Sequence, residues 1–380
     1  MTMKLKSIYY TQEHYGREWK ICSDGSQPIE LQAINLIVGK NASGKSSVVR
    51  VIRTLADLLC GETTPSKLLY STASFDVTFE DEDKIYFYRL TFHKGSVVEE
   101  KLSIDGSLLI ERTNGSGKIL YSNVGKTIDF ATGDSTLAVT REDTLQHPYL
   151  APLQNWGKWL NHFSFSTKMG QNIAIKEGSR ELQNNETISV KESDRVADMF
   201  SQGCAIDENF IGRIIDDAKA INYNISGLSI ENIHHPVLNV KVIAVNEDRL
   251  AGYTDQTEMS SGMFRAFSLL IQMEYAILRK TATCILIDDI GEGLDYDRSK
   301  QLIALVKQKA EAHDIQLIMT TNDENIMNGI DIDYWQIVER EDGRTVFYNR
   351  QNTKELFDEF EYAGFSNSKF FKLNMFKEDN

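Results

Sequence analysis

The chain lacks the features that mark membrane proteins and disulfide-rich secreted proteins. Its 380 residues include no run of eighteen apolar residues, so the sequence predicts no membrane span. The four cysteines have neither the paired spacing of a disulfide framework nor the spacing of a metal site. The segment Met1 to Lys6 is charged and is predicted to lead into a short strand rather than to act as a signal peptide. We therefore expect a cytoplasmic protein.

Positive charge is also scarce. The chain has 41 lysines and arginines against 55 aspartates and glutamates, which gives a formal net charge of −14. This charge does not indicate a surface coated for duplex DNA, although a local basic groove for nucleic acid stays open. Internal repeats and long heptad patterns are absent from the sequence, and its length suits one large domain or two modest ones.

The most informative segment is a glycine-rich loop that fits the pattern G-x-x-x-x-G-K-[ST]. The apolar run Ile34 to Val38 precedes it as a predicted strand, and apolar residues at helical spacing follow it. Glycines let the backbone wrap phosphates so that successive N–H groups point inward, and the following helix adds its positive N-terminus. The predicted phosphate-binding residues are Gly39, Lys40, Asn41, Ala42, Ser43, Gly44, Lys45, Ser46 and Ser47.

Two residues of this loop have more specific predicted roles. The Lys45 ammonium group can reach the β- and γ-phosphates of a nucleoside triphosphate, and the Ser46 hydroxyl suits Mg²⁺. The sequence therefore predicts ATP and Mg²⁺ as ligands.

Two other glycine–lysine segments are similar to this loop but lack its context. Gly115-Ser116-Gly117-Lys118 has Arg112 in place of the first glycine, and Gly125-Lys126-Thr127 has Leu120 there. Both lie among alternating apolar residues that are typical of strands, with no helix behind them. We therefore predict that both are hairpin turns in an antiparallel β meander.

A strand that ends in two carboxylates forms the second motif. The apolar run Cys284 to Ile287 leads directly to Asp288 and Asp289. A carboxylate at the end of a buried strand, next to a phosphate loop, can hold Mg²⁺ through water. The carboxylate that follows it can orient or deprotonate an attacking water molecule. The sequence predicts the first role for Asp288 and the second for Asp289.

The third motif consists of Ser260, Ser261 and Gly262, which come just before a long apolar helix. Small hydroxyl residues and a glycine at a helix N-terminus make an anion-binding end, but an ordinary helix cap has the same composition. The order of the motifs decides between the two interpretations. Phosphate loop, small-residue helix start and aspartate strand are followed by Gly293-Leu294-Asp295 and by a strand that ends at Thr320-Thr321-Asn322.

In this order the motifs resemble the ABC-class ATPases of the RecF, OLD and SMC-head group, especially the compact "AAA family ATPase" proteins of bacterial anti-phage systems. The resemblance implies an α/β fold: an ABC-type P-loop ATPase head with an antiparallel β subdomain and an inserted helical subdomain. The expected divisions are an N-terminal lobe with phosphate loop and meander (1–148), a helical insertion (149–225), a C-terminal ATPase lobe (226–350) and an aromatic-rich tail (351–380).

The resemblance also implies roles for particular residues. Ser260 to Gly262 fall on the ABC signature, Asp288 on the Walker B aspartate, and Asp289 on the catalytic position, where these families usually carry glutamate. Asn322 falls on the switch position, usually a histidine; asparagine can hydrogen-bond a γ-phosphate but cannot shuttle a proton. The glutamine that usually joins the two lobes is left open among Gln146, Gln154 and Gln171.

The expected function follows from the same resemblance. We expect slow ATP hydrolysis, a head-to-tail homodimer or higher homo-oligomer, and a separately encoded effector that the ATPase gates in anti-phage defence. Two alternatives stay open: a RecF-like DNA repair ATPase, and a nucleotide-dependent scaffold with negligible turnover. The tail from Lys354 to Phe376 is rich in aromatic residues, which fits either packing on the chain itself or a docking surface for a partner.

Overall fold

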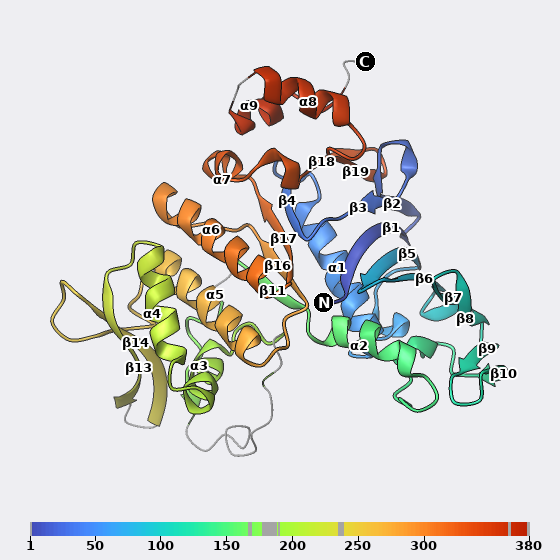
Figure 1. Cartoon of the computed structure of the whole chain (residues 1–380), viewed down its shortest axis with the longest axis horizontal. Coiled ribbons are helices and arrows are strands. Elements are labelled where there is room, and N and C mark those ends of the chain that lie inside the picture. Colours follow the sequence, from blue (N-terminus) through green and yellow to red (C-terminus); the bar gives the residue numbers. More distant parts are fainter. Residues whose placement is uncertain are drawn as a thin grey trace. The chain divides into compact units, whose positions relative to one another are not determined.

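The computed structural model shows two compact units (Figure 1). The first unit combines Met1–Leu160 with Ile330–Asn380, and the second is Asn161–Gly329. These units divide the chain at other places than the predicted boundaries after residues 148, 225 and 350. The residues that the structure describes are 2–165, 169–176, 188, 191–234, 239–363 and 366–377.

The first unit is built on a sheet with the strand order β10-β9-β8-β7-β6-β5-β1-β2-β19-β18-β4, and β3 pairs with β1. The strands are β1 (Lys4–His14), β2 (Arg17–Ser23), β3 (Ile29–Glu30), β4 (Ile34–Val38), β5 (Thr72–Asp81), β6 (Lys84–His93), β7 (Ser96–Ile104), β8 (Ser107–Thr113), β9 (Ser116–Tyr121), β10 (Lys126–Ala131), β18 (Trp335–Glu341) and β19 (Arg344–Tyr348). The helices are α1 (Lys45–Leu59), α2 (Ala151–Lys158), α8 (Lys354–Ala363) and α9 (Asn367–Lys372).

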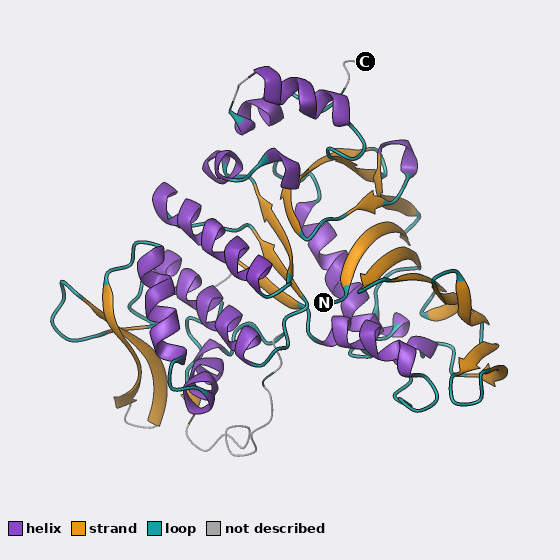
Figure 2. Cartoon of the chain, in the orientation of Figure 1, coloured by secondary structure: helices purple, strands orange, loops and turns teal. Residues whose placement is uncertain are grey.

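Strands β5 to β10 form the antiparallel meander that the sequence predicts (Figure 2). In β5 the more and less buried side chains alternate, because successive residues of a strand face opposite sides of the sheet. Gly115 lies in the turn between β8 and β9, and Gly125 lies in the turn between β9 and β10. The prediction of hairpin turns is therefore confirmed for these two glycines, whereas the residues that follow them in each segment belong to β9 and β10.

The strand that leads into the predicted phosphate loop is fully buried. All five residues of β4 are buried, and β4 pairs in parallel with β18, where Leu36 lies opposite Trp335. β18 and β19 form an antiparallel hairpin, and β19 pairs in parallel with β2. α2 packs against α1 so closely that a Cβ on Gly157 would lie 2.4 Å from the Ala56 carbonyl oxygen. The strand, the loop and the helix are thus held by elements from both ends of the chain.

The aromatic-rich tail packs on the chain itself. Its buried phenylalanines are Phe357, Phe360, Phe370, Phe371 and Phe376. The Phe376 ring packs against Tyr348 of β19, with ring centroids 5.3 Å apart. For these side chains, self-packing is confirmed and the alternative of an exposed docking surface is wrong.

The second unit contains parallel strands in the order β17-β16-β11 and a separate sheet in the order β12-β14-β13, with β15 paired to β14. Its strands are β11 (Asn161–Ser164), β12 (Ile175–Lys176), β13 (Ile225–His234), β14 (Asn239–Glu247), β15 (Thr254–Asp255), β16 (Cys284–Asp288) and β17 (Gln316–Thr321). Its helices are α3 (Val196–Ile206), α4 (Phe210–Ala220), α5 (Ser261–Leu278), α6 (Tyr296–Ala312) and α7 (Glu324–Gly329).

The predicted helical insertion is not purely helical. It contains α2, α3 and α4, but α2 ends at Lys158, and β11 begins three residues later. β11 pairs in parallel with β16, with Asn161 opposite Ile285. A buried strand needs hydrogen-bond partners for its backbone, and β11 supplies them to β16. A strand this short carries too few alternating residues to be read from the sequence.

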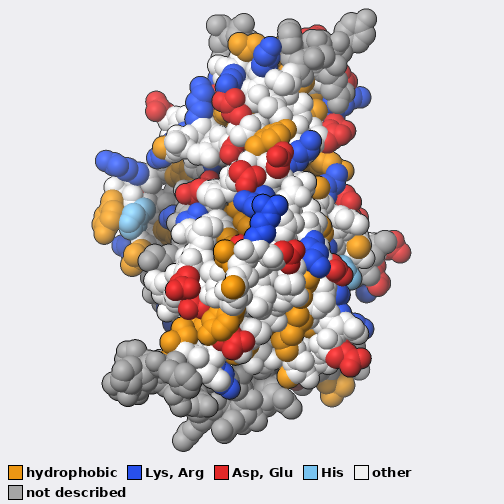
Figure 3. Space-filling model, turned by 90° about the vertical axis from the view of Figure 1, so that its left-hand side faces the viewer, with side chains coloured by type: hydrophobic (Ala, Val, Ile, Leu, Met, Phe, Trp, Pro, Cys, Tyr) orange, Lys and Arg blue, Asp and Glu red, His pale blue; other side chains and the backbone are white. Residues whose placement is uncertain are grey.

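One face of the molecule carries side chains of both charges. On the face in Figure 3, acidic and basic side chains are interspersed, without a continuous basic area. Within the described ranges, no helix is both long and apolar enough to cross a membrane.

Candidate nucleotide-binding site

The predicted phosphate loop joins β4 to α1 in the first unit. α1 begins at Lys45, and the preceding Gly44 has φ +106°. Ala42 also has a positive φ, +64°, and Ser43 N donates to Lys40 O at 3.1 Å. The backbone therefore turns back on itself between strand and helix, as a phosphate-wrapping loop requires.

At two positions of the loop, neighbouring atoms leave no room for a side chain, so glycine is required. A Cβ on Gly39 would lie 2.4 Å from Ser43 Oγ and 2.9 Å from Val338 O. A Cβ on Gly44 would lie 2.7 Å from Thr345 Oγ1, and side-chain-bearing residues rarely adopt its φ. The loop thus lies tightly against the hairpin of β18 and β19.

Two polar side chains are turned into the loop. The Lys45 side chain is buried, and its Nζ donates to Gly39 O at 2.8 Å and to Lys40 O at 3.2 Å. Ser43 Oγ is buried and has no hydrogen-bond partner among the residues that the structure describes. Leaving a buried polar group without a partner costs about 1–3 kcal/mol. Phosphate oxygens are acceptors for both groups, so these residues fit a phosphate chain.

The other predicted loop residues are accessible to a ligand. The exposed ones are Lys40, Asn41, Ala42 and Ser46. Ser46 and Ser47 lie in the first turn of α1, where the backbone N–H groups have no partners within the helix. The complete predicted loop therefore comes together in the first unit.

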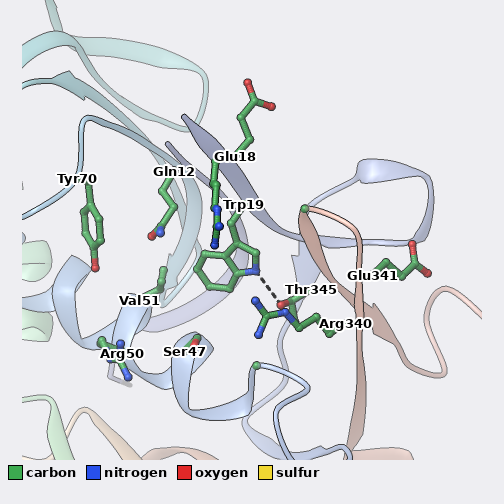
Figure 4. A pocket seen from close by; sticks show the side chains of 13 residues that line it. Gln12, Glu18, Trp19, Ser47, Arg50, Val51, Tyr70, Arg340, Glu341 and Thr345 are labelled. Atoms are coloured by element: carbon green, nitrogen blue, oxygen red, sulfur yellow. Dashed lines mark hydrogen bonds between the residues drawn. The ribbon is translucent and has the colours of Figure 1, made fainter. Parts of the chain in front are cut away.

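A cavity of about 510 Å³ lies beside the start of α1 (Figure 4). Gly44 and Ser47 belong to its lining, together with Trp19 of β2. The Trp19 indole donates from Nε1 to Thr345 Oγ1 at 3.0 Å and packs edge-on against Tyr10, with centroids 5.8 Å apart. These contacts fix an aromatic ring next to the phosphate loop.

In the second unit, the two predicted carboxylates follow each other at the end of β16. Asp288 is buried, and Asp289 is partly exposed. Thr320 of β17 contacts both residues: its Oγ1 donates to Asp288 Oδ1 at 2.6 Å and accepts from Asp289 N at 2.9 Å. The parallel register, with Ile287 opposite Met319, brings Thr320 to this position. The strand ends therefore hold the two aspartates in a defined arrangement.

The backbone of Asp289 explains why aspartate stands at this position. Its φ is +54°, in the left-handed region. Among residues other than glycine, aspartate and asparagine are enriched there, because their short side chains can hydrogen-bond locally.

The Ser260–Gly262 segment starts α5 as predicted. Ser260 caps the helix, and its Oγ accepts from Met263 N at 3.2 Å. Ser261 is exposed at the first helical position. A Cβ on Gly262 would lie 2.2 Å from Gly293 O, so the helix start packs directly on the Gly293 loop. The cap is confirmed, and the anion-binding role of the segment stays a prediction.

The residues after the Gly293 loop begin the next helix. Asp295 caps α6 by accepting from Arg298 N at 3.0 Å, and this hydrogen bond lowers the pKa of the Asp295 carboxyl group. Asn322 follows β17 directly and is exposed, one residue after the buried Thr321. Asn322 thus lies at the same end of β17 as Thr320, and its role as a phosphate sensor stays a prediction.

The glutamine that joins the two lobes stays open among Gln146, Gln154 and Gln171. Gln171 Nε2 donates to Gln256 O at 3.1 Å and to Met259 O at 2.8 Å, immediately before Ser260. Gln154 belongs to α2 in the first unit and donates to Val139 O at 2.8 Å instead. Gln171 is thus hydrogen-bonded to the residue before Ser260, and a role in joining the lobes stays a prediction for all three glutamines.

Three residues of these sites were not predicted from the sequence: Thr320, Trp19 and Arg340. The contact of Thr320 with the aspartates could have been predicted from the sequence, because parallel pairing of two strands that end in polar residues brings their ends together. The sequence contains no pattern that would have indicated Trp19 or Arg340, because each belongs to a strand outside every motif. Arg340 lines the cavity beside α1 and is described further below.

The fold is similar to solved SMC head domains. A structure described as the SmcHead bound to the C-winged helix domain of ScpA is 17% identical to this chain, with a TM-score of 0.51, and the match covers 90% of this chain and 96% of that one. The Smc head domain with an extended coiled coil bound to the C-terminal domain of ScpA, derived from Pyrococcus furiosus, is 13% identical (TM-score 0.48; 95% and 100% covered). The SMC head domain from Thermotoga maritima is 13% identical (TM-score 0.45; 91% and 98% covered). The predicted fold, an ABC-type P-loop ATPase head, is confirmed by the first of these structures.

The sequence places the chain more narrowly. Residues 34–328 match the family described as "AAA domain, putative AbiEii toxin, Type IV TA system", and the chain belongs to this family. No curated protein matches the chain. The family match begins at β4 and ends before β18, so the hairpin that packs against the phosphate loop lies outside it.

Proposed function

We propose that the chain binds MgATP at the loop of the first unit and hydrolyses it slowly. The observation that carries this proposal is the interior of the loop, where the buried Ser43 hydroxyl has no partner in the described part of the chain and Lys45 donates to loop carbonyls. Phosphate oxygens would accept from both side chains, with the charge-assisted hydrogen bond coming from Lys45. The N-terminus of α1 adds backbone donors for the same anion.

The Mg²⁺ that accompanies ATP would be held by the Ser46 hydroxyl and, through water, by Asp288. When bound, this ion supplies positive charge to the phosphate oxygens. Asp289 would orient or deprotonate the attacking water, and Thr320 keeps its backbone in place. We expect slow turnover because the Asp289 carboxylate is one methylene shorter than that of glutamate.

The base and ribose of ATP would enter the cavity beside α1. Its volume of about 510 Å³ lies in the range of small-ligand sites. The fixed Trp19 ring offers an aromatic face at the edge of the phosphate loop.

We also propose that ATP joins two copies head to tail. In the ABC-class ATPases that the chain resembles, the signature of one protomer closes the phosphate site of the other. The exposed Ser261 at the start of α5 is suited to such a contact. By their descriptions, two SMC heads of similar fold bind a domain of a separate protein. We propose that this chain likewise gates a separately encoded effector, and its role in anti-phage defence rests on the family resemblance.

Binding and turnover are tested separately. Isothermal titration calorimetry with MgATP measures binding, with Lys45→Ala as the negative control, and phosphate release measures turnover. Wild-type protein that binds MgATP without any turnover would be a nucleotide-dependent scaffold, which would contradict the ATPase proposal.

Assembly is tested by light scattering of Asp289→Asn with and without MgATP. ATP should trap the dimer, because hydrolysis is slowed. Ser261→Glu should fold but stay monomeric, since its carboxylate repels the phosphate. If the association state changed neither with MgATP nor with Ser261→Glu, the head-to-tail arrangement would be contradicted.

A further inference from the structure

Arg340 of the β18–β19 hairpin lies beside the phosphate loop, although the hairpin is outside residues 34–328, which match the family. Arg340 lines the cavity beside α1. It also lines a second cavity of about 430 Å³, whose wall includes the loop residues Lys40 to Ser43. In Figure 4, the Arg340 side chain runs toward Trp19 and the first turn of α1, whereas Glu341 points away. One guanidinium group therefore adjoins the loop through both cavities.

The acidic residues on either side of Arg340 are paired with other cations. Glu339 pairs with Lys377 Nζ at 2.6 Å, and Glu341 pairs with Arg344 Nη2 at 2.5 Å. Successive residues of a strand face opposite sides, so Arg340 points away from both acids. Across the described ranges, the guanidinium of Arg340 takes part in no ion pair and no hydrogen bond.

The cavity beside α1 has an excess of positive charge, although the chain as a whole is acidic. Arg17 and Arg50 line it together with Arg340. The acids of its lining are Glu18 and Glu341, and Glu341 is already paired with Arg344. Cations gathered in a cleft raise the local concentration of anions and favour their binding.

We propose that Arg340 binds the phosphate chain of the nucleotide at the point where it leaves the loop toward the base, next to Gly44 and Ser47. This inference rests on the proposed function, in which the loop holds MgATP. The planar guanidinium offers paired donors that match two phosphate oxygens. The β18–β19 hairpin would then take part in nucleotide binding, and the Lys377–Glu339 pair would link the C-terminal tail to the strand that carries Arg340.

The test compares three variants with three ligands by calorimetry and competition: MgATP, MgADP and inorganic tripolyphosphate. Arg340→Gln should weaken all three by about tenfold or more, because a charge-assisted hydrogen bond is lost. Arg340→Lys should keep part of the affinity, since lysine keeps the positive charge but lacks the paired donors of the guanidinium group. Lys118→Gln is the charge control: it removes a cation from the exposed side of β9, away from the cavity lining, and all three ligands should bind as they do to the wild type.

Each other outcome contradicts the inference. Affinities of Arg340→Gln within twofold of the wild type would remove Arg340 from the site. A loss for MgATP but not for tripolyphosphate would place the contact at the base or ribose. An equal loss of affinity in Lys118→Gln would show that the effect comes from overall charge. If the wild type bound none of the three ligands, the proposed function would fail and this inference with it. Arg340 is exposed, so thermal unfolding of the variants should match the wild type.

Discussion

The tripeptide Ser-Gly-Lys occurs twice in the first unit and adopts two different structures. Ser43-Gly44-Lys45 leads into α1, whereas Ser116-Gly117-Lys118 runs along β9. Gly44 has φ +106°, and Gly117 is paired with Arg112 across the sheet. The Lys45 side chain is buried in its loop, whereas Lys118 is exposed opposite Asp129. The same three residues thus form a loop and a helix start in one place and part of a strand in the other.

The flanking residues account for this difference. After Lys45, apolar residues recur at helical spacing, and α1 can bury them on one face. After Lys118 come Ile119, Leu120 and Tyr121, a short apolar run that is bounded by turns, as is typical of a strand. A helix start leaves backbone donors open for a ligand, whereas a strand inside a sheet uses them in pairing.

The two regions also differ in how their buried polar groups are satisfied. Arg112, next to the second tripeptide, is fully buried, and its guanidinium donates to Gly133 O at 3.0 Å and pairs with Glu100 at 3.4 Å. Glu100 in turn accepts from the backbone N–H of Ala138 at 2.7 Å. In the phosphate loop, the buried Ser43 hydroxyl has no partner within the described ranges. Buried polar groups that the chain satisfies stabilise the fold, and the Ser43 hydroxyl is one that a phosphate oxygen could satisfy.

The largest effect is expected from removing the lysine of each tripeptide. Lys45→Ala should weaken MgATP binding by about a hundredfold or more, because it removes the cation aimed at the phosphates. Lys118→Ala should leave the affinity unchanged, since Lys118 lies on an exposed strand face. Calorimetry on both variants decides whether only one tripeptide is functional, and equal affinities would contradict the loop assignment.

Turnover provides the next contrast, because it should depend on the second unit as well as on the loop. Asp289→Asn should keep MgATP binding and lower the rate of phosphate release by about a hundredfold. Asparagine tolerates the left-handed backbone at this position, so the variant should fold normally. A wild-type rate of hydrolysis in Asp289→Asn would remove Asp289 as the base.

The glycines should separate stability from binding. In Gly117→Ala, the new Cβ would lie 2.2 Å from Glu111 O, so the strands must shift, at a cost of about 1–3 kcal/mol in the free energy of unfolding. Folded Gly117→Ala should still bind MgATP with wild-type affinity. Gly44→Ala should weaken MgATP binding, because the loop cannot keep its conformation. Thermal unfolding of both variants measures stability, and calorimetry measures MgATP binding. If only Gly117→Ala bound MgATP more weakly, the assignment of the binding site to the Gly44 loop would be contradicted.

The smallest effect is expected at Asn322. If Asn322 only senses the γ-phosphate, Asn322→His should bind MgATP normally and hydrolyse it at the same rate or severalfold faster. Imidazole can hydrogen-bond the phosphate and titrates near neutrality, so the rate should gain a pH dependence around pH 6–7. Phosphate release measured across that range is the readout, and a complete loss of ATP binding would argue against the switch position.

The sequence was sufficient for the parts of the site that are continuous in the chain. The loop before α1, the aspartate strand and the cap at Ser260 each carry their pattern within a few residues, and the structure has the predicted helix start, strand and cap at these places. The meander was also predictable, because its strands alternate and are joined by glycine-containing turns.

The remaining features depend on contacts between distant segments. Trp19 is fixed by Thr345, a residue 326 positions later, and no local pattern joins the two. β11 was missed because four residues carry little periodicity, and the division into units was missed because the first unit takes residues from both ends of the chain. The left-handed backbone of Asp289 is a conformational detail that its neighbours in sequence do not reveal.

The parallel pairing of β4 with β18 also has a consequence during synthesis. Leu36 of β4 cannot pair until Trp335 of β18 has been translated, about 300 residues later. At 5–20 residues per second, this delay lasts on the order of 15–60 seconds. Throughout that interval, the edge of β4 that will pair with β18 has no partner and is open to chaperones or to misassembly with another nascent chain. The support that β18 gives to the predicted phosphate loop, where Gly39 packs against Val338, is therefore added only late in synthesis.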